Sequence, residues 1–216
     1  MTWTRDEEVS ETLRLMGVQQ RRTASVGRAI VLAAAVAGIF VGGSALGGKL
    51  PAADGRDTNL EKRLYAPSGP AVVLTLPDIK RRLKALRGRV VLLHLWATWC
   101  GPCVQEMPTL AQLADSLRPR GVDLFSVSLD PVNRQNLERV GALVGGRGKN
   151  RLTRAIVQMD DPDRFIADID PRWDGTIPAL FAFDRAGVLR GALLGEVTRT
   201  EIEALVDAAL AARGAP

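Results

Sequence analysis

The chain has 216 residues, of which 46% are hydrophobic and 25% charged, values typical of a folded globular protein rather than a disordered one. The formal net charge is only +5, and no arginines interleave with aromatic residues, so we expect no nucleic-acid partner. Two cysteines exclude a disulfide-dense secreted scaffold, and with the single histidine they offer too few ligands for a four-ligand zinc site.

Residues 29–48 form an uncharged, apolar run between Arg28 and Lys49. Because about 20 helical residues cross the hydrocarbon core of a bilayer, the run predicts one transmembrane helix. The segment before it is long and partly acidic, unlike the short basic start of a signal peptide, which favours a retained anchor over a cleaved one. The arginines nearest the run precede it and predict that residues 1–28 are a cytoplasmic segment.

Residues 49–70 carry proline, glycine and mixed charge without a period, which predicts a tether. From residue 71 onward, strand and helix patterns alternate. The expected strands are 71–76, 89–96, 122–129, 179–184 and 188–194, and the expected helices are 78–87, 131–144 and 200–212.

The nearly continuous apolar run 89–96 is typical of a central strand that is buried on both faces. Residues 185–187 predict the turn of an antiparallel hairpin, whereas 145–154 predict a solvated basic loop. The sequence therefore predicts an α/β domain over residues 71–213, with a central mixed β-sheet and helices on both faces.

The segment that carries chemistry is WATWCGPC, residues 96–103, where the predicted central strand gives way to a helix. Cys100 and Cys103 would lie on adjacent turns, close enough to form a disulfide. Unpaired backbone N–H groups at the helix start favour the thiolate of Cys100, which we expect to be the more exposed sulfur. That thiolate would attack a disulfide, and Cys103 would resolve the mixed disulfide. Pro102 fits the first helical turn, where its missing N–H is no loss.

Other roles for the pair fit less well. A c-type haem needs a histidine directly after the second cysteine, where Val104 stands. A purely structural disulfide closing so short a loop would constrain the unfolded chain little. We therefore expect a redox-active Cys100–Cys103 disulfide, no other cofactor and no metal.

The motif resembles that of the thioredoxin superfamily and, more narrowly, that of the membrane-tethered TlpA/ResA-like thiol-disulfide oxidoreductases. The similarity covers residues 66–213, including Glu106-Met107-Pro108, Thr176-Ile177-Pro178 and the turn 184–187. The resemblance implies a thioredoxin fold preceded by one transmembrane helix. It also implies a single-pass protein of the inner membrane, with the thioredoxin-like domain on the extracytoplasmic side.

The resemblance further implies that Ile177–Pro178 is a cis bond facing the cysteines, with the Ile177 backbone pairing with a substrate chain as an added strand. Trp99, Gly101 and Pro102 complete the predicted substrate-contacting residues. Family members often have threonine after this proline, whereas this chain has Ala179. Trp96 and Trp173 are each open to two interpretations, bordering the site or packing in the core.

Two further residues are candidates for proton transfer. Glu106 follows Cys103 by one helical turn, and the resemblance gives a glutamate there a role in tuning the cysteines or passing protons. A carboxylate that only favours the helix N-terminal half is the alternative. His94, the single histidine, stands on the central strand where thioredoxin has a buried aspartate, and would accept the proton of Cys103 directly or through one water. A buried packing histidine is the alternative.

Gly-Pro between the cysteines matches thioredoxin, whose potential of about −270 mV marks a reductant. We therefore expect reduction of oxidised protein substrates, with apocytochrome c as one candidate, and a membrane electron donor of the DsbD/CcdA type. The alternatives are a disulfide-forming oxidase and a membrane-anchored metal- or protein-binding module.

Overall fold

The computed structural model describes residues 57–145 and 152–212. These residues form a six-stranded sheet in the order β1-β4-β3-β2-β5-β6. Strands β1, β4, β3 and β2 run parallel, and β5 and β6 continue the sheet in antiparallel fashion, which confirms the predicted mixed sheet. The strands are β1 (Val72–Leu74), β2 (Val90–Trp96), β3 (Val122–Ser128), β4 (Ala155–Val157), β5 (Ala179–Phe183) and β6 (Leu189–Leu194).

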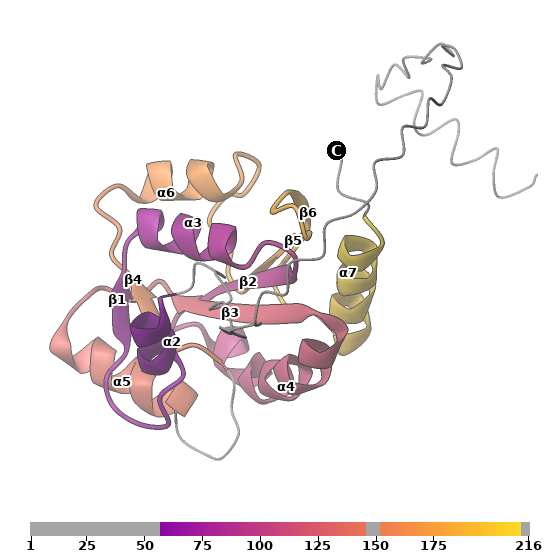
Figure 1. Ribbon diagram of the computed structural model, residues 1–216. Coiled ribbons are helices and arrows are strands. Elements are labelled where there is room, and N and C mark those ends of the chain that lie inside the picture. The colour runs from indigo at the N-terminus through magenta and orange to yellow at the C-terminus, as the bar shows by residue number, and fades with distance from the viewer. Residues whose placement is uncertain (1–56, 146–151, 213–216) are drawn as a thin grey trace, which may run out of the picture. The chain divides into compact units, whose positions relative to one another are not determined.

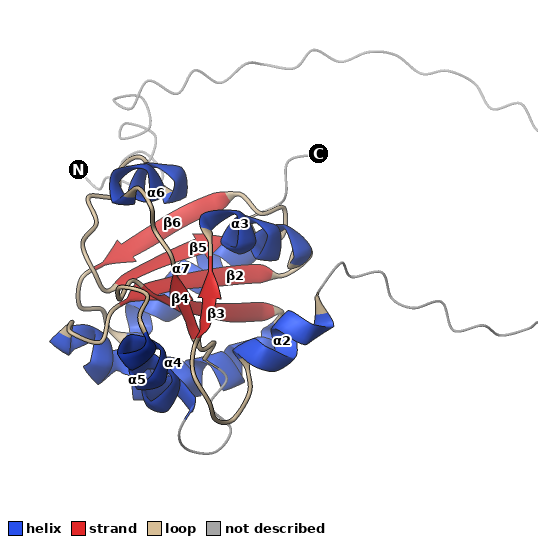
Figure 2. Cartoon of the chain, turned by 90° about the vertical axis from the view of Figure 1, so that its left-hand side faces the viewer, coloured by secondary structure: helices blue, strands red, loops and turns tan. Residues whose placement is uncertain are grey.

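Helices cover both faces of the sheet, as predicted (Figure 1). Helices α3 and α6 pack on one face, and α4, α5 and α7 on the other. Figure 1 shows α3 and α6 together above β2 and β3, and Figure 2 shows α4 and α5 below the strands. The helical segments are α2 (Thr58–Leu64), α3 (Leu76–Ala85), α4 (Gly101–Leu117), the 3-10 turn Arg118–Arg120, α5 (Arg134–Gly145), α6 (Pro162–Ile169) and α7 (Arg199–Ala211).

Strand β2 is the centre of the fold. All of its residues are buried, which confirms the expectation from its apolar sequence. Leu92, His94 and Trp96 point to the α4 face, whereas Leu93 and Leu95 point to the α3 face. The carboxyl end of β2 leads towards α4, so a completely buried strand positions the cysteine motif.

Side-chain caps fix the starts of α3 and α7. Thr75 and Asp78 form a reciprocal capping box at α3, and Thr198 and Glu201 form another at α7. The hydrogen bonds from the Thr75 side chain and backbone N–H lower the pKa of Asp78 below its ordinary value. These caps place the boundaries of both helices close to where the sequence predicts them.

Strand β4 and helix α6 were not predicted. Strand β4 has only three residues, too few to show a period, and α6 has only eight. The start of α6 nonetheless carries ordinary signals, because Asp161 caps the helix and Pro162 occupies its first position. The predicted solvated loop 145–154 is wrong at its end, since Thr153 and Arg154 are buried.

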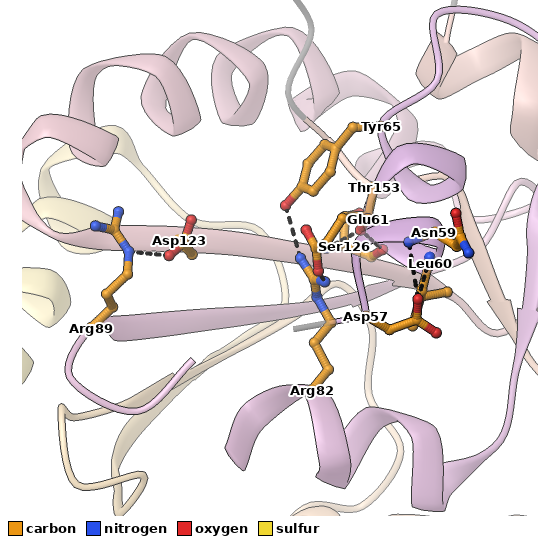
Figure 3. Close-up of polar contacts among 10 residues, drawn as sticks. All are labelled: Asp57, Asn59, Leu60, Glu61, Tyr65, Arg82, Arg89, Asp123, Ser126 and Thr153. Atoms are coloured by element: carbon orange, nitrogen blue, oxygen red, sulfur yellow. Dashed lines mark hydrogen bonds and ion pairs between the residues drawn. The ribbon is translucent and has the colours of Figure 1, made fainter. Parts of the chain in front are cut away.

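The predicted tether, residues 49–70, is wrong for its second half, because residues 58–64 form α2. Asp57 accepts hydrogen bonds from the N–H groups of Asn59 and Leu60 at 2.9 and 3.1 Å, which caps the helix (Figure 3). Leu64 at the other end is completely buried in the core. The tether-like composition of this segment therefore did not predict the helix, which Leu64 fixes in the core.

A buried arginine fastens α2 to the rest of the domain. Arg82 of α3 forms an ion pair with Glu61 and donates to Tyr65 Oη at 3.1 Å (Figure 3). Its guanidinium also lies 4.7 Å from the ring centroid of Phe125 on β3. Because a buried charge is costly without partners, these contacts hold α2 against the sheet.

A second buried arginine secures the segment that follows α2. Arg154 donates to the carbonyl oxygens of Gly69 and, at 3.1 Å, of Arg63. Burial lowers the pKa of this guanidinium from its ordinary value. The domain thus includes α2 and residues 65–70, which the predicted start at residue 71 left out.

The predicted transmembrane run, residues 29–48, lies outside the described residues, as does the predicted cytoplasmic segment 1–28. Among the described helices, none is both long and apolar enough to cross a bilayer.

Candidate active site

The two cysteines lie at the start of α4, where the sequence predicts them. Cys100 is the N-cap residue, and its Sγ accepts a hydrogen bond from the backbone N–H of Cys103 at 3.3 Å. The two sulfurs form a disulfide. Cys100 is 6% exposed and Cys103 is completely buried, so Cys100 is the more accessible sulfur, as expected. Pro102 occupies the first turn of α4.

The loop between β2 and Cys100 is held by backbone contacts at both ends. The N–H of Leu129, just after β3, donates to Trp96 O at 2.7 Å, and the N–H of Cys100 donates to Ala97 O at 3.2 Å. Trp99, at the tip of this loop, is 67% exposed. A large apolar side chain directly beside the accessible sulfur is suited to contact a polypeptide.

A buried carboxylate that was not predicted also holds this loop through hydrogen bonds. Asp130 is 2% exposed and accepts hydrogen bonds from the N–H of Thr98 at 2.8 Å and from its hydroxyl at 2.6 Å. The hydroxyl of Ser128 donates to the same carboxylate at 2.5 Å. Asp130 directly follows the predicted strand 122–129, and the carboxyl ends of parallel strands meet at one edge of a sheet, so its position was a usable signal.

His94 and Glu106, predicted separately, are joined in the structure. His94 Nε2 lies 2.9 Å from Glu106 Oε1, and His94 Nδ1 lies 3.0 Å from Ser126 Oγ. His94 is 1% exposed. Both ring nitrogens therefore have partners other than a cysteine in the disulfide-bonded protein, and the expectation that His94 accepts the Cys103 proton stays a prediction. Ser126, opposite His94 in the β2–β3 register, was missed because a serine in a strand carries no distinctive pattern.

The Ile177–Pro178 bond is cis, which confirms the expectation from the resemblance. Pro178 precedes β5, whose first residue, Ala179, pairs with Leu95 near the carboxyl end of β2. Pro178, His94 and Glu106 line one narrow crevice that has no room for a water molecule. The crevice brings three of the predicted site residues together.

The backbone of Ile177 is unpaired. Of the described residues, none forms a backbone–backbone hydrogen bond with its N–H or carbonyl group. Pro178 O, by contrast, accepts from the N–H of Gly195 at 2.8 Å. The half-buried Ile177 thus presents free backbone groups at the end of the sheet where the motif lies.

The other two candidate tryptophans belong to the core. Trp96 is completely buried. Trp173 is 4% exposed, donates through Nε1 to Thr176 O at 2.8 Å, and packs edge-on against Phe165 and Phe181. Trp173 therefore supports the loop that leads to Pro178 and does not border the site itself.

A groove of about 330 Å³ lies beside the motif, between α4 and the start of α7. It is lined by Pro102, Glu106, Glu196 and Arg199, among others. In the part of the chain that the structure describes, no three cysteine, histidine or acidic side chains are grouped to hold a metal ion. The chemistry that the arrangement offers is thiol–disulfide exchange at Cys100, with a carboxylate and an imidazole behind it.

The sequence profile of the AhpC/TSA family matches residues 67–192, a range that holds both cysteines, Glu106 and Pro178. The chain belongs to this family. The family assignment, the disulfide at the start of α4 and the mixed sheet together establish a domain of the thioredoxin fold.

Curated relatives narrow the assignment. The chain is 30% identical to the thiol-disulfide oxidoreductase ResA of Geobacillus kaustophilus over 66% of its own length and 78% of the relative. It is 28% identical to ResA of Bacillus cereus over 66% of its own length and 77% of the relative. Within the AhpC/TSA family, the chain is thus a ResA-like thiol-disulfide oxidoreductase.

Solved structures of similar proteins include a thioredoxin-family thiol:disulfide interchange protein from Chlorobium tepidum. It has 19% sequence identity and a TM-score of 0.47, and the match covers 58% of this chain and 83% of that protein.

Proposed function

We propose that this AhpC/TSA-family protein reduces disulfides of protein substrates through the Cys100–Cys103 dithiol. The observation that carries the proposal is the pair itself: an accessible Cys100 that caps α4, bonded to a buried Cys103. The helix start favours a thiolate at Cys100, and Gly101-Pro102 between the sulfurs is the sequence of thioredoxin, a reductant.

In the reduced protein, the Cys100 thiolate attacks one sulfur of the substrate disulfide, and the other substrate sulfur leaves as a thiolate that takes up a proton. The Cys103 thiol then loses its proton and attacks Cys100 Sγ. This step forms the Cys100–Cys103 disulfide and releases the second substrate thiol. Two electrons pass from protein to substrate, and the protein ends in the oxidised state that the structure shows.

Resolution requires a base for the proton of Cys103, because a buried thiol resists ionisation. Glu106 lies one helical turn after Cys103 and is partly exposed, so we assign it this task. His94 supports it through the 2.9 Å hydrogen bond and in turn contacts Ser126. His94 thus acts through Glu106 rather than on the sulfur.

The substrate binds as an extended segment over Trp99, Gly101 and Pro102. The unpaired N–H and carbonyl groups of Ile177, next to the cis proline, offer it backbone hydrogen bonds of the kind made by an added strand. Apocytochrome c is the candidate substrate that follows from the resemblance to the ResA-like proteins.

We further propose that the domain faces the cell envelope from a retained anchor at residues 29–48 of the inner membrane. A reductant in an oxidising compartment needs electrons supplied across the membrane, so its partner would be a membrane donor of the DsbD/CcdA type. A reporter that is active only outside the cytoplasm, fused after Pro216, should be active in cells. An inactive reporter would overturn this orientation.

The decisive experiment is substrate trapping. A Cys103→Ser variant retains Cys100 and should accumulate mixed disulfides with envelope proteins that mass spectrometry identifies, whereas Cys100→Ser should accumulate none. The direction is tested by the reduction potential: a value near about −270 mV supports a reductase, whereas one near about −120 mV would make the protein an oxidase. Retention of metal by the reduced pair after dialysis, with no trapped substrate, would instead favour a binding module.

A further inference from the structure

Asp130 is a buried carboxylate beside the motif, and the proposed reaction assigns it no role. It follows β3 directly, is 2% exposed, and receives three hydrogen bonds from two residues: two from Thr98 and one from Ser128. The backbone N–H of Thr98 and the hydroxyls of Thr98 and Ser128 thus all lie within hydrogen-bond distance of its oxygens.

Two of its three accepted hydrogen bonds come from the reactive loop. Thr98 stands two residues before Cys100 and one before the exposed Trp99. Asp130 accepts hydrogen bonds from both the N–H and the hydroxyl of Thr98, so it holds the backbone and the side chain of this residue. The Trp96–Leu129 hydrogen bond joins the same two loops one step nearer the sheet.

The charge of Asp130 is not neutralised by an ion pair. Within residues 57–145 and 152–212, no lysine, arginine or histidine forms a salt bridge with it. The other ionisable groups around the motif are Glu106 on α4, paired with His94 on β2, together with Glu196 and Arg199 across the groove. Arg199 is itself paired with Glu203 at 2.8 Å.

We propose that Asp130 is a positioning residue for thiol–disulfide exchange. Through Thr98, it holds the Trp99–Cys100 loop in the geometry that receives a polypeptide, and its negative charge opposes the thiolate at Cys100. The start of α4 favours that thiolate, so the two influences act in opposite directions on one sulfur. The inference rests on the proposed function for its substrate, but the effect of Asp130 on Cys100 does not require any turnover.

Two substitutions separate charge from positioning. In Asp130→Asn, the amide oxygen can take the place that accepts from Thr98 N–H and Ser128, and the Thr98 hydroxyl can rotate to accept from the amide. The contacts are thus retained while the charge is lost. Thr98→Val keeps the shape of the side chain and the charge of Asp130 but removes the hydroxyl donor.

Asp184 provides a control for burial and distance. It is 1% exposed, accepts hydrogen bonds from the N–H groups of Ala186 and Val188 and pairs with Arg190, but it lies at the hairpin after β5. Because β5 is antiparallel to β2, this hairpin is at the opposite end of β2 from the motif. Asp184→Asn thus removes an equally buried charge far from Cys100.

The first measurement is the rate of iodoacetamide alkylation of Cys100 in the reduced protein as a function of pH, read by peptide mass spectrometry. Asp130→Asn should move the midpoint of this profile down by about one pH unit, whereas Asp184→Asn and Thr98→Val should leave it in place. An unchanged midpoint in Asp130→Asn, or an equal shift in Asp184→Asn, would overturn the proposal that the charge of Asp130 opposes the Cys100 thiolate.

The second measurement compares insulin, a polypeptide disulfide, with glutathione disulfide as substrates. Thr98→Val should raise the KM for insulin about fivefold and leave the rate with glutathione disulfide unchanged, because only the polypeptide uses the loop. Equal effects on both substrates, or none, would overturn the positioning role. If the wild-type protein reduces neither substrate, the proposed function fails, while the alkylation profile still tests Asp130.

Discussion

His94 on β2 and Glu106 on α4 share a hydrogen bond of 2.9 Å between Nε2 and Oε1. The contact joins the central strand to the helix that carries both cysteines, one turn after Cys103. Since Nδ1 of the same ring contacts Ser126 Oγ, the imidazole is held at both ends. The two candidate residues for proton transfer thus form one unit.

Because the two residues form one unit, the effects of substituting His94 and Glu106 on the rate should not add. His94→Asn and Glu106→Gln should each slow the resolution of a preformed mixed disulfide on Cys100, and the double variant should be little slower than Glu106→Gln alone. Stopped-flow measurement of resolution between pH 5 and 8 checks this, because loss of a base also alters the pH profile. Rates and a pH profile unchanged in His94→Asn would show that His94 is a packing residue.

The exposure of the two sulfurs predicts their order of reaction. With limiting iodoacetamide at neutral pH, the reduced protein should be alkylated first at Cys100, since Cys103 is completely buried. Peptide mass spectrometry distinguishes the two products. Preferential labelling of Cys103 would reverse the assignment of attacking and resolving cysteines.

The hairpin carboxylate Asp184 predicts a loss of stability in acid. Burial opposes its charge, but hydrogen bonds from Val188, Arg190 and Ala186 outweigh burial and lower its pKa below the ordinary value. A lowered pKa in the folded state stabilises the protein above the unfolded value of about 3.9, and this stabilisation is lost as the pH falls through the folded value.

Asp184→Asn should therefore destabilise the domain by about 1–3 kcal/mol at pH 7, and its deficit relative to wild type should shrink as the pH drops below about 4. Urea unfolding followed by circular dichroism at several pH values measures the effect. A deficit that is constant with pH would mean that the charge of Asp184 contributes nothing.

The buried ion pair between α2 and α3 predicts a larger effect. Arg82→Met leaves Glu61 without its partner and should cost about 3 kcal/mol of unfolding free energy. The neighbouring Arg81→Met is the control, because the exposed Arg81–Asp78 pair should contribute less than about 1 kcal/mol. Similar losses in the two variants would contradict the anchoring role of Arg82.

The sequence was most informative where one residue type decides the structure. The unbroken apolar run of β2 and the paired cysteines each carry their own local signal, and the cis bond before Pro178 came from the family resemblance. The hairpin of β5 and β6 was placed by its turn.

What could not be predicted depends on contacts between distant segments. Helix α2 is held by two residues remote in sequence: Arg82 pairs with Glu61, and the backbone N–H of Arg154 donates to Leu64 O. Asp130 matters because β3 lies next to β2 in register, and His94 turns to Glu106 only because α4 packs on that face. Local propensity contains none of this information.

The docking of α2 shortens the stretch of chain that can link the domain to the proposed membrane anchor. The described part of the domain begins at Asp57, and residues 49–56 lie between it and the proposed end of the membrane span. Fully extended, those eight residues reach at most about 29 Å, roughly the thickness of the bilayer core, whereas the whole segment 49–70 would have reached about 79 Å. If the proposed anchor at residues 29–48 is retained, this short linker would keep the domain close to the membrane surface, a geometry that suits polypeptides delivered there better than proteins diffusing through the envelope.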